Sequence, residues 1–172
     1  EEQAGKAAEA VGAEDASESS FTSGTTGKPK GAIASHGQRI RVFRTWAETV
    51  GLRDGERMMV IAPFFHTFGY KAGLLACLMT RATIVPLKVF DVDEAVRTIT
   101  EERIDVVPGP PTLYSSLLEH PATLPAIRLA VTGAAVVPTA LIARMGEELG
   151  GQEVNTAYGL TECCGLATGR PT

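Results

Sequence analysis

Short apolar segments alternate with helical patterns along most of the chain, and this alternation limits the folds that the chain can adopt. The predicted strands are 32–34, 58–62, 82–87, 104–107, 128–132 and 154–156. The predicted helices are 36–50, 70–80, 92–103, a helix that begins at Pro111, and 138–149. This order is typical of right-handed βαβ crossovers. We therefore predict an α/β fold in which alternating βα units form a largely parallel sheet flanked by helices.

The composition is that of a protein with one core and no nucleic-acid-binding surface. The 172 residues, 44% of them hydrophobic, are sufficient for one domain. A net charge of −4 argues against a nucleic-acid backbone as partner. No apolar run approaches the roughly 18 residues of a membrane span, and no signal-peptide pattern opens the chain, so we expect a soluble, cytoplasmic protein. The cysteines have neither disulfide-framework nor zinc-site spacing, and we expect reduced thiols at Cys77, Cys163 and Cys164.

The most informative motif is the segment 21–31, which reads Phe-Thr-Ser-Gly-Thr-Thr-Gly-Lys-Pro-Lys-Gly. Its glycines permit positive φ, and successive backbone N–H groups in such a turn converge on one anion. Its hydroxyls can bind phosphate oxygens or a metal ion, and its lysines add positive charge. A Walker A loop is excluded because only two residues separate Gly24 from Gly27 and because Pro29 follows Lys28. A flexible linker is the alternative, but a linker needs neither two lysines nor a closing glycine.

Two further motifs follow predicted strands, at the edge where α/β sheets bind ligands. The segment 63–69 places three phenylalanines around His66, which suits the wall of an apolar pocket with a polar tip. The alternative for this segment is a buried aromatic cluster with a hydrogen-bonded histidine. The small residues 133–135 let a flat ring such as adenine approach the backbone, although a tight strand-to-helix turn needs them equally.

A last motif, Tyr-Gly-Leu-Thr-Glu at 158–162, follows the final predicted strand. Tyr158 can stack on a base, Thr161 offers a hydroxyl, and Glu162 is a hard oxygen ligand suited to Mg²⁺. By itself the pattern is weak, because a glutamate after a threonine is usually solvated. Its position after the other motifs makes it informative.

The segment 21–31 resembles the phosphate-binding signature of the adenylate-forming superfamily, which includes acyl-CoA synthetases, firefly luciferase and the adenylation domains of peptide synthetases. The segment 63–69 is similar to the acyl-site motif of that superfamily, and 158–162 is similar to its aromatic-Gly-x-Thr-Glu motif. The motifs occur in the family's order, and the resemblance extends from Asp15 to the end of the chain. One departure is the polar segment 17–20, which stands where family members carry an apolar strand, so we expect this strand to be short or at an edge.

The resemblance implies a partial domain. Residues 15–172 would be the central part of the AMP-binding N-terminal domain of an adenylate-forming enzyme. Residues 1–14 are rich in Ala and Glu, and we expect a disordered or frayed start. The segment that precedes the phosphate loop in family members, and their C-terminal domain with its catalytic lysine, have no counterpart here. We therefore expect the 172 residues alone to bind nucleotide weakly and not to turn over.

The resemblance also implies the chemistry and the site. A carboxylate attacks the α-phosphorus of MgATP to give an acyl-adenylate and pyrophosphate, and the thiol of coenzyme A then displaces AMP. The nucleotide would be bound by Thr22, Ser23, Gly24, Thr25, Thr26, Gly27, Lys30, Gly133, Ala134, Ala135, Thr156, Ala157, Tyr158, Gly159 and Thr161. Thr25 and Glu162 would hold Mg²⁺. The catalytic residues would be His66, Thr161 and Glu162, with His66 in the carboxylate pocket.

The implied partners are a small carboxylic acid, ATP and coenzyme A. The apolar segment 65–69 favours a fatty or other apolar acid over an amino acid, because a site that selects an amino acid needs a carboxylate for the ammonium group. The segments 64–73 and 108–112 resemble those of actinobacterial ligases for fatty or steroid-ring-derived acids, and this resemblance implies a fatty or steroid-derived acid. Two alternatives stay open. One is an adenylation domain for an amino acid, and the other is a non-catalytic nucleotide-binding module.

Overall fold

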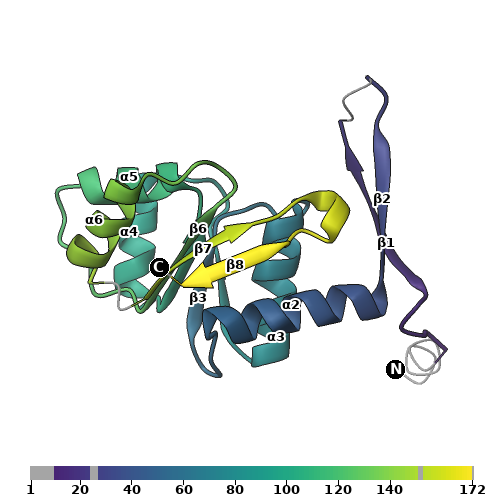
Figure 1. The fold of residues 1–172 in the computed structure, drawn as a ribbon. Coiled ribbons are helices and arrows are strands. Elements are labelled where there is room, and N and C mark those ends of the chain that lie inside the picture. The colour runs from purple at the N-terminus through teal and green to yellow at the C-terminus, as the bar shows by residue number, and fades with distance from the viewer. Residues whose placement is uncertain (1–9, 24–26, 151–152, 172) are drawn as a thin grey trace.

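The computed structural model describes residues 10–23, 27–150 and 153–171. In it, six strands form one sheet in the order β4-β3-β5-β6-β7-β8 (Figure 1). The strands are β3 (Arg57–Val60), β4 (Thr83–Pro86), β5 (Val106–Gly109), β6 (Leu129–Gly133), β7 (Glu153–Tyr158) and β8 (Thr168–Pro171). Neighbouring strands run parallel except β8, which is antiparallel to β7. The predicted α/β fold with a largely parallel sheet is confirmed, and β8 is an addition to the predicted strands.

Helices cover both faces of this sheet (Figure 1). They are α2 (His36–Val50), η1 (Phe68–Leu75), α3 (Ala76–Thr80), α4 (Val92–Glu101), α5 (Pro111–Glu119) and α6 (Thr139–Glu148). Successive strand residues point to opposite faces, so Met59 and Val107 pack with α4, α5 and α6, whereas Met58 and Val106 pack with α2, η1 and α3. The core thus consists of two apolar clusters with the sheet between them. No helix in the described ranges combines the length and apolarity that a membrane span requires.

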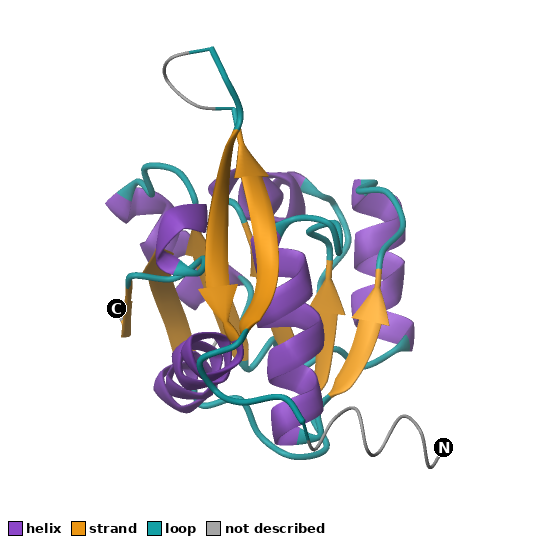
Figure 2. Ribbon diagram, turned by 90° about the vertical axis from the view of Figure 1, so that its right-hand side faces the viewer, coloured by secondary structure: helices purple, strands orange, loops and turns teal. Residues whose placement is uncertain are grey.

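A separate hairpin projects from this body (Figure 1, Figure 2). It is formed by β1 (Ala16–Thr22) and β2 (Lys30–Ser35), which pair antiparallel and form their own two-stranded sheet. β2 runs directly into α2, and the Ser35 side chain caps that helix by accepting a hydrogen bond from the backbone N–H of Gln38 at 3.2 Å. The polar residues 17–20 therefore lie in a strand that pairs only with β2 within the described ranges.

The chain before β1 is partly described. Residues 1–9 of the expected frayed start lie outside the described residues. Beyond them, the backbone N–H of Asp15 donates to the carbonyl of Gly12 at 3.2 Å, which closes a turn. The N–H groups of His36 and Gly37 donate to the carbonyls of Asp15 and Ala13, at 3.1 and 2.7 Å. These bonds attach the start of β1 to the first turn of α2.

The helix predicted at 70–80 is instead two segments, the π-helix η1 and the short α-helix α3. Two glycines allow η1 to lie directly on the end of β3. A Cβ on Gly69 would lie 2.3 Å from the carbonyl oxygen of Ala62, and a Cβ on Gly73 would lie 2.8 Å from Cγ1 of Val60. No larger residue permits these contacts. Since π-helical turns occur often at functional sites, η1 is a candidate functional segment.

Candidate functional site

An open groove of about 990 Å³ lies at the carboxyl ends of β6 and β7. This volume is at the upper end of the range of about 300–1,000 Å³ for small-molecule sites. Its walls come from the loop between β6 and α6, from α6 itself, and from the end of β7 with the segment that follows. Among the residues predicted to bind nucleotide, those that line the groove are Ala134, Ala135, Thr156, Ala157, Tyr158 and Gly159. Two motifs that are about 20 residues apart therefore meet in one place, because parallel strands end at the same edge of a sheet.

Small residues at the end of β6 give this groove its shape. Gly133 pairs with Ala157 of β7, and a Cβ on Gly133 would lie 2.1 Å from the carbonyl oxygen of Ala157. Ala134 then adopts a left-handed conformation with φ 64°, which turns the chain out of the sheet. Backbone atoms rather than large side chains therefore form this edge. Tyr158 is 59% exposed beside it, so its ring is free to stack on a flat ligand.

Thr161 and Glu162 lie in the segment that connects β7 to β8. They belong to a 3₁₀ turn, η2 (Thr161–Cys163). The backbone N–H of Leu160 donates to the Sγ atom of Cys163 at 3.3 Å. The thiol of Cys163 donates in turn to the carbonyl oxygen of Leu160 at 3.2 Å. Cys163 thus closes the turn that presents Thr161 and Glu162, two of the three predicted catalytic residues, and so has a structural role.

Glu162 is exposed, and its carboxylate makes no hydrogen bond or ion pair with another described residue. Within the described ranges, no group of three or more His, Cys, Asp or Glu side chains could hold a metal ion. An exposed carboxylate is a suitable ligand for Mg²⁺, which keeps several waters and is commonly held by one or two carboxylates together with substrate phosphates. Glu162 is therefore suited to a magnesium ion that arrives with a nucleotide.

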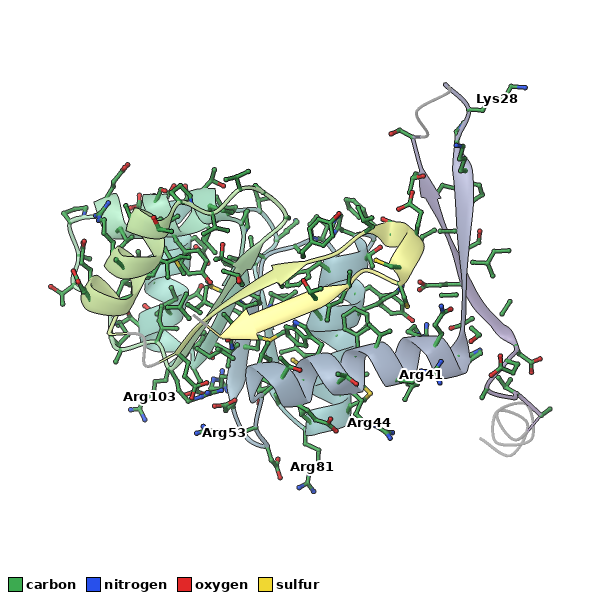
Figure 3. All side chains as sticks on the ribbon, in the orientation of Figure 1. Lys28, Arg41, Arg44, Arg53, Arg81 and Arg103 are labelled. Atoms are coloured by element: carbon green, nitrogen blue, oxygen red, sulfur yellow. The ribbon has the colours of Figure 1, made fainter. Side chains whose placement is uncertain are left out.

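The predicted phosphate loop lies at the far end of the β1–β2 hairpin, beyond the pair formed by Thr22 and Lys30. Lys28 points away from the body of the molecule (Figure 3). Gly27 has a φ of 80°, as expected for a glycine in a tight turn. The exposed residues of the loop include Ser23, Gly27 and Lys28. The predicted residues that lie outside the described ranges are Gly24, Thr25 and Thr26.

His66 lies in the loop that follows β3, and it is exposed. The backbone N–H of Phe68 donates to its Nδ1 at 3.1 Å, so the neutral ring carries its proton on Nε2. Phe65 is 94% exposed, and the alternative of a buried aromatic cluster is therefore wrong for this residue. The loop also touches the segment after η2, since a Cβ on Gly165 would lie 2.2 Å from Cγ2 of Thr67.

The predicted site residues are brought together to different degrees. The adenine-site motifs share one groove, and η2 follows it directly along the chain. The hairpin contacts η2 through β2. No hydrogen bond or ion pair joins Lys30, His66 and Glu162 among the described residues.

Sequence reasoning missed residues of two kinds. Val136 and Leu160 line the groove as exposed apolar side chains, 91% and 50% exposed, and nothing in their local pattern indicates this. Lys71 is almost completely buried in η1, where it forms an ion pair with Glu18. The sequence does contain a signal that Lys71 is unusual, because Lys71 is the single charged residue in the apolar stretch 68–80.

Comparison with known proteins identifies sequence relatives. A family model described as AMP-binding enzyme matches residues 1–172. The chain is 50% identical over 165 residues to the 3-[(3aS,4S,7aS)-7a-methyl-1,5-dioxo-octahydro-1H-inden-4-yl]propanoyl:CoA ligase of Mycobacterium tuberculosis. This match covers 94% of the chain but only 32% of the length of that relative.

Solved structures share the fold. The inhibitor-bound N-terminal domain of FACL13 from Mycobacterium tuberculosis superimposes with a TM-score of 0.83 at 30% identity, over 94% of this chain and 40% of that chain. O-succinylbenzoate coenzyme A synthetase (MenE) from Bacillus subtilis, in complex with ATP and magnesium ion, gives a TM-score of 0.82 at 27% identity, over 93% of this chain and 33% of that chain. Each similarity thus extends over nearly the whole of this chain and a minor part of the other protein.

Proposed function

The chain belongs to the AMP-binding enzyme family, and on this basis we propose that it supplies the nucleotide-binding part of an acyl-CoA ligase. In the proposed reaction, a carboxylate attacks the α-phosphorus of ATP and pyrophosphate leaves. The thiol of coenzyme A then attacks the acyl carbon, and AMP leaves. We further propose that residues 15–172 are the central part of an N-terminal domain in a longer enzyme, since the chain spans 32% of its Mycobacterium tuberculosis relative.

The groove at the carboxyl ends of β6 and β7 is the observation that carries this proposal. It gathers the small residues Ala134 and Ala135 and the segment 156–159 around a space suited to a flat ring. The base would stack on Tyr158, and backbone atoms near Gly133 would approach its edge. The MenE structure, which shares this fold, was solved in complex with ATP and magnesium ion, and this supports a nucleotide as the ligand.

Charge stabilisation is the second proposed task. Lys30, the hydroxyl of Thr161 and the phosphate loop 22–27 would bind phosphate oxygens, and Glu162 would hold Mg²⁺. The ion would neutralise charge on the phosphates. Reactions of this type require positioning and electrostatic stabilisation more than a protein nucleophile. The exposed, unpaired carboxylate of Glu162 supports its proposed role.

The carboxylic acid would lie near His66, whose neutral ring can donate from Nε2 to a carboxylate oxygen. His66 follows β3. In the sheet, β4 lies on one side of β3 and β5 lies on the other, so the direction in which strands are added reverses between β3 and β5. Ligands of open α/β sheets bind at such a point. The exposed rings of Phe64 and Phe65 favour an apolar acid. A fused-ring propanoic acid is our specific proposal, because the name of the Mycobacterium tuberculosis relative describes a ligase for such an acid.

Exchange of pyrophosphate into ATP, measured on the full-length protein, tests the proposed function. We expect exchange that depends on a carboxylic acid and on Mg²⁺. Glu162→Ala and Lys30→Ala should each lower it by at least about 100-fold, because each removes a group that stabilises phosphate charge. Glu148→Ala and Lys88→Ala change exposed residues outside the proposed site and should retain the wild-type rate.

A panel of acids then tests the substrate class. We expect fused-ring propanoates to support exchange better than linear fatty acids, and amino acids to support none. Preference for an amino acid would contradict the proposed acid and favour a peptide-synthetase type of adenylation. Absence of exchange with every acid, combined with nucleotide binding, would favour a non-catalytic module.

A further inference from the structure

Lys71 is 1% exposed, although η1 is otherwise apolar. Its Nζ forms an ion pair with the carboxylate of Glu18 on β1. The same nitrogen donates a hydrogen bond to the carbonyl oxygen of Cys164 at 3.1 Å, and the Sγ of Cys164 lies 3.4 Å away. A single buried ammonium group therefore joins three segments that are far apart in the sequence: β1, η1 and the residue that follows η2.

Stability alone does not explain a charge at this position. The free-energy cost of removing two charged groups from water offsets most of the energy of their attraction. Apolar residues of similar volume often stabilise a core equally well. The surrounding cluster is apolar and includes Ala72 and Ala76, so it offers the environment that an unbranched apolar side chain prefers. The distinctive property of the ammonium is that its three donors have fixed partners, and these partners define the relative positions of the three segments.

The partners of Lys71 are themselves held in place. Nη1 of Arg39 on α2 lies 4.0 Å from the carboxylate of Glu18 and donates to the hydroxyl of Tyr70 at 2.7 Å. The guanidinium of Arg39 also lies 5.5 Å from the centre of the Tyr70 ring. On the other side, Gly69 lies against the backbone of Ala62 and Pro63 just after β3, and Gly73 lies against the side chain of Val60 in β3. The ion pair is thus fixed to both α2 and the central sheet.

Two of the joined segments carry parts of the proposed site. Glu18 lies on the strand that leads to Thr22 and the phosphate loop, and Cys164 follows η2, which carries Glu162. We propose that Lys71 is a positioning residue, which sets the β1–β2 hairpin against η2 so that phosphates bound by the hairpin meet Glu162. This inference rests on the proposed function, and β2 already contacts η2 in the structure.

The test is a comparison of ATP with AMP in the full-length protein. Lys71→Met removes the ammonium and keeps an unbranched side chain, and Lys88→Met makes the same change at an exposed position. We expect Lys71→Met to lower kcat/KM for ATP in the exchange reaction on the order of 10- to 100-fold, because the phosphates lose their alignment with Glu162. The inhibition constant of AMP should stay at the wild-type value, since the groove of β6 and β7 contains no part of the hairpin. Lys88→Met should match the wild type in both measurements.

Glu18→Gln provides a second variant in case Lys71→Met does not fold. Its amide keeps the size of the side chain and an acceptor for Lys71, so we expect a smaller fall in kcat/KM for ATP, again with unchanged AMP inhibition. Wild-type kcat/KM for ATP in either folded variant would overturn the inference. Equal weakening of ATP and AMP would also overturn it, because that result indicates a general packing role. A wild-type protein without acid-dependent exchange would instead contradict the proposed function, and the inference with it.

Discussion

Gly69 and Gly146 show how differently single glycines contribute to this fold. Gly69 is buried in η1 at a point where a Cβ would collide with the carbonyl oxygens of Ala62 and Pro63, both at 2.3 Å. These oxygens belong to the backbone, so the collision cannot be relieved by rotation of a side chain. Gly146 is an exposed residue of α6, and a Cβ added to it would have no described atom of another element within 4 Å. Only the first glycine is required by the structure.

Alanine at these two positions should therefore change stability in opposite directions. Gly69→Ala should lower the free energy of unfolding by about 1–3 kcal/mol, because η1 must move away from β3. Gly146→Ala should raise it by about 0.5–1 kcal/mol, because alanine restricts the unfolded chain and favours the helix. Urea denaturation of both variants and the wild type measures the two effects. Destabilisation by Gly146→Ala, or a neutral Gly69→Ala, would contradict the packing described for these residues.

At the scale of elements, the junction between β2 and α2 joins the hairpin to the body. Ser35 is both the last residue of β2 and the N-cap of α2. Ser35→Ala should therefore lower the free energy of unfolding by about 1 kcal/mol, because it leaves the N–H of Gln38 without its acceptor. Ser116→Ala is the matched control, since the hydroxyl of Ser116 bonds only within α5, to the carbonyl of Thr112. Thermal unfolding of both variants checks the difference, and equal melting temperatures would contradict the capping role.

Elements whose signals lie within their own sequence were predictable. The bounds of α2 agree with the predicted 36–50, because Ser35 marks its start and apolar spacing continues to Val50. Likewise, Pro111 begins α5 as predicted. η1 was not predictable, because its wide turns depend on the contact of two glycines with β3. β8 was missed because it is short, and because pairing with β7 rather than its own composition makes it a strand.

The same distinction applies to the candidate site. Motifs that directly follow strands, such as 133–135 and 156–159, could be assigned to one edge of the sheet from the βα alternation alone. The ion pair of Lys71 with Glu18 could not be predicted, because the partners are 53 positions apart in the sequence and lysine is almost never buried. Tertiary contacts of this kind decide how the hairpin sits against the body, and no local pattern encodes them.

At the scale of the whole molecule, each of the two apolar clusters contains a buried group that loses a proton only at high pH. Cys77 of α3 lies in the cluster with α2, and Tyr114 of α5 lies in the cluster on the other face of the sheet. Burial raises the pKa of the Cys77 thiol from 9.0 to about 12. Burial also raises the pKa of the Tyr114 phenol above its ordinary value of 10.0. Both groups are therefore neutral in the folded protein under mildly alkaline conditions.

Alkaline pH should consequently destabilise both halves of the core. In the unfolded chain Cys77 ionises near pH 9.0, whereas in the folded protein it keeps its proton to about pH 12. Between these values the unfolded state binds fewer protons, so the free energy of unfolding falls as pH rises, by at most about 1.4 kcal/mol per pH unit for each group. The contribution is fully present below pH 9.0, and the contribution of Tyr114 decreases above 10.0.

Urea denaturation at a series of pH values measures this fall, and variants assign it to the two groups. Cys77→Ala should unfold more readily at neutral pH, because it leaves a cavity, but its stability should depend less on pH above 9.0 than that of the wild type. Tyr114→Phe should reduce the slope above pH 10.0. If Cys77→Ala shows the wild-type slope, the thiol of Cys77 ionises equally in the folded and unfolded states, and the cluster around α3 is open to water.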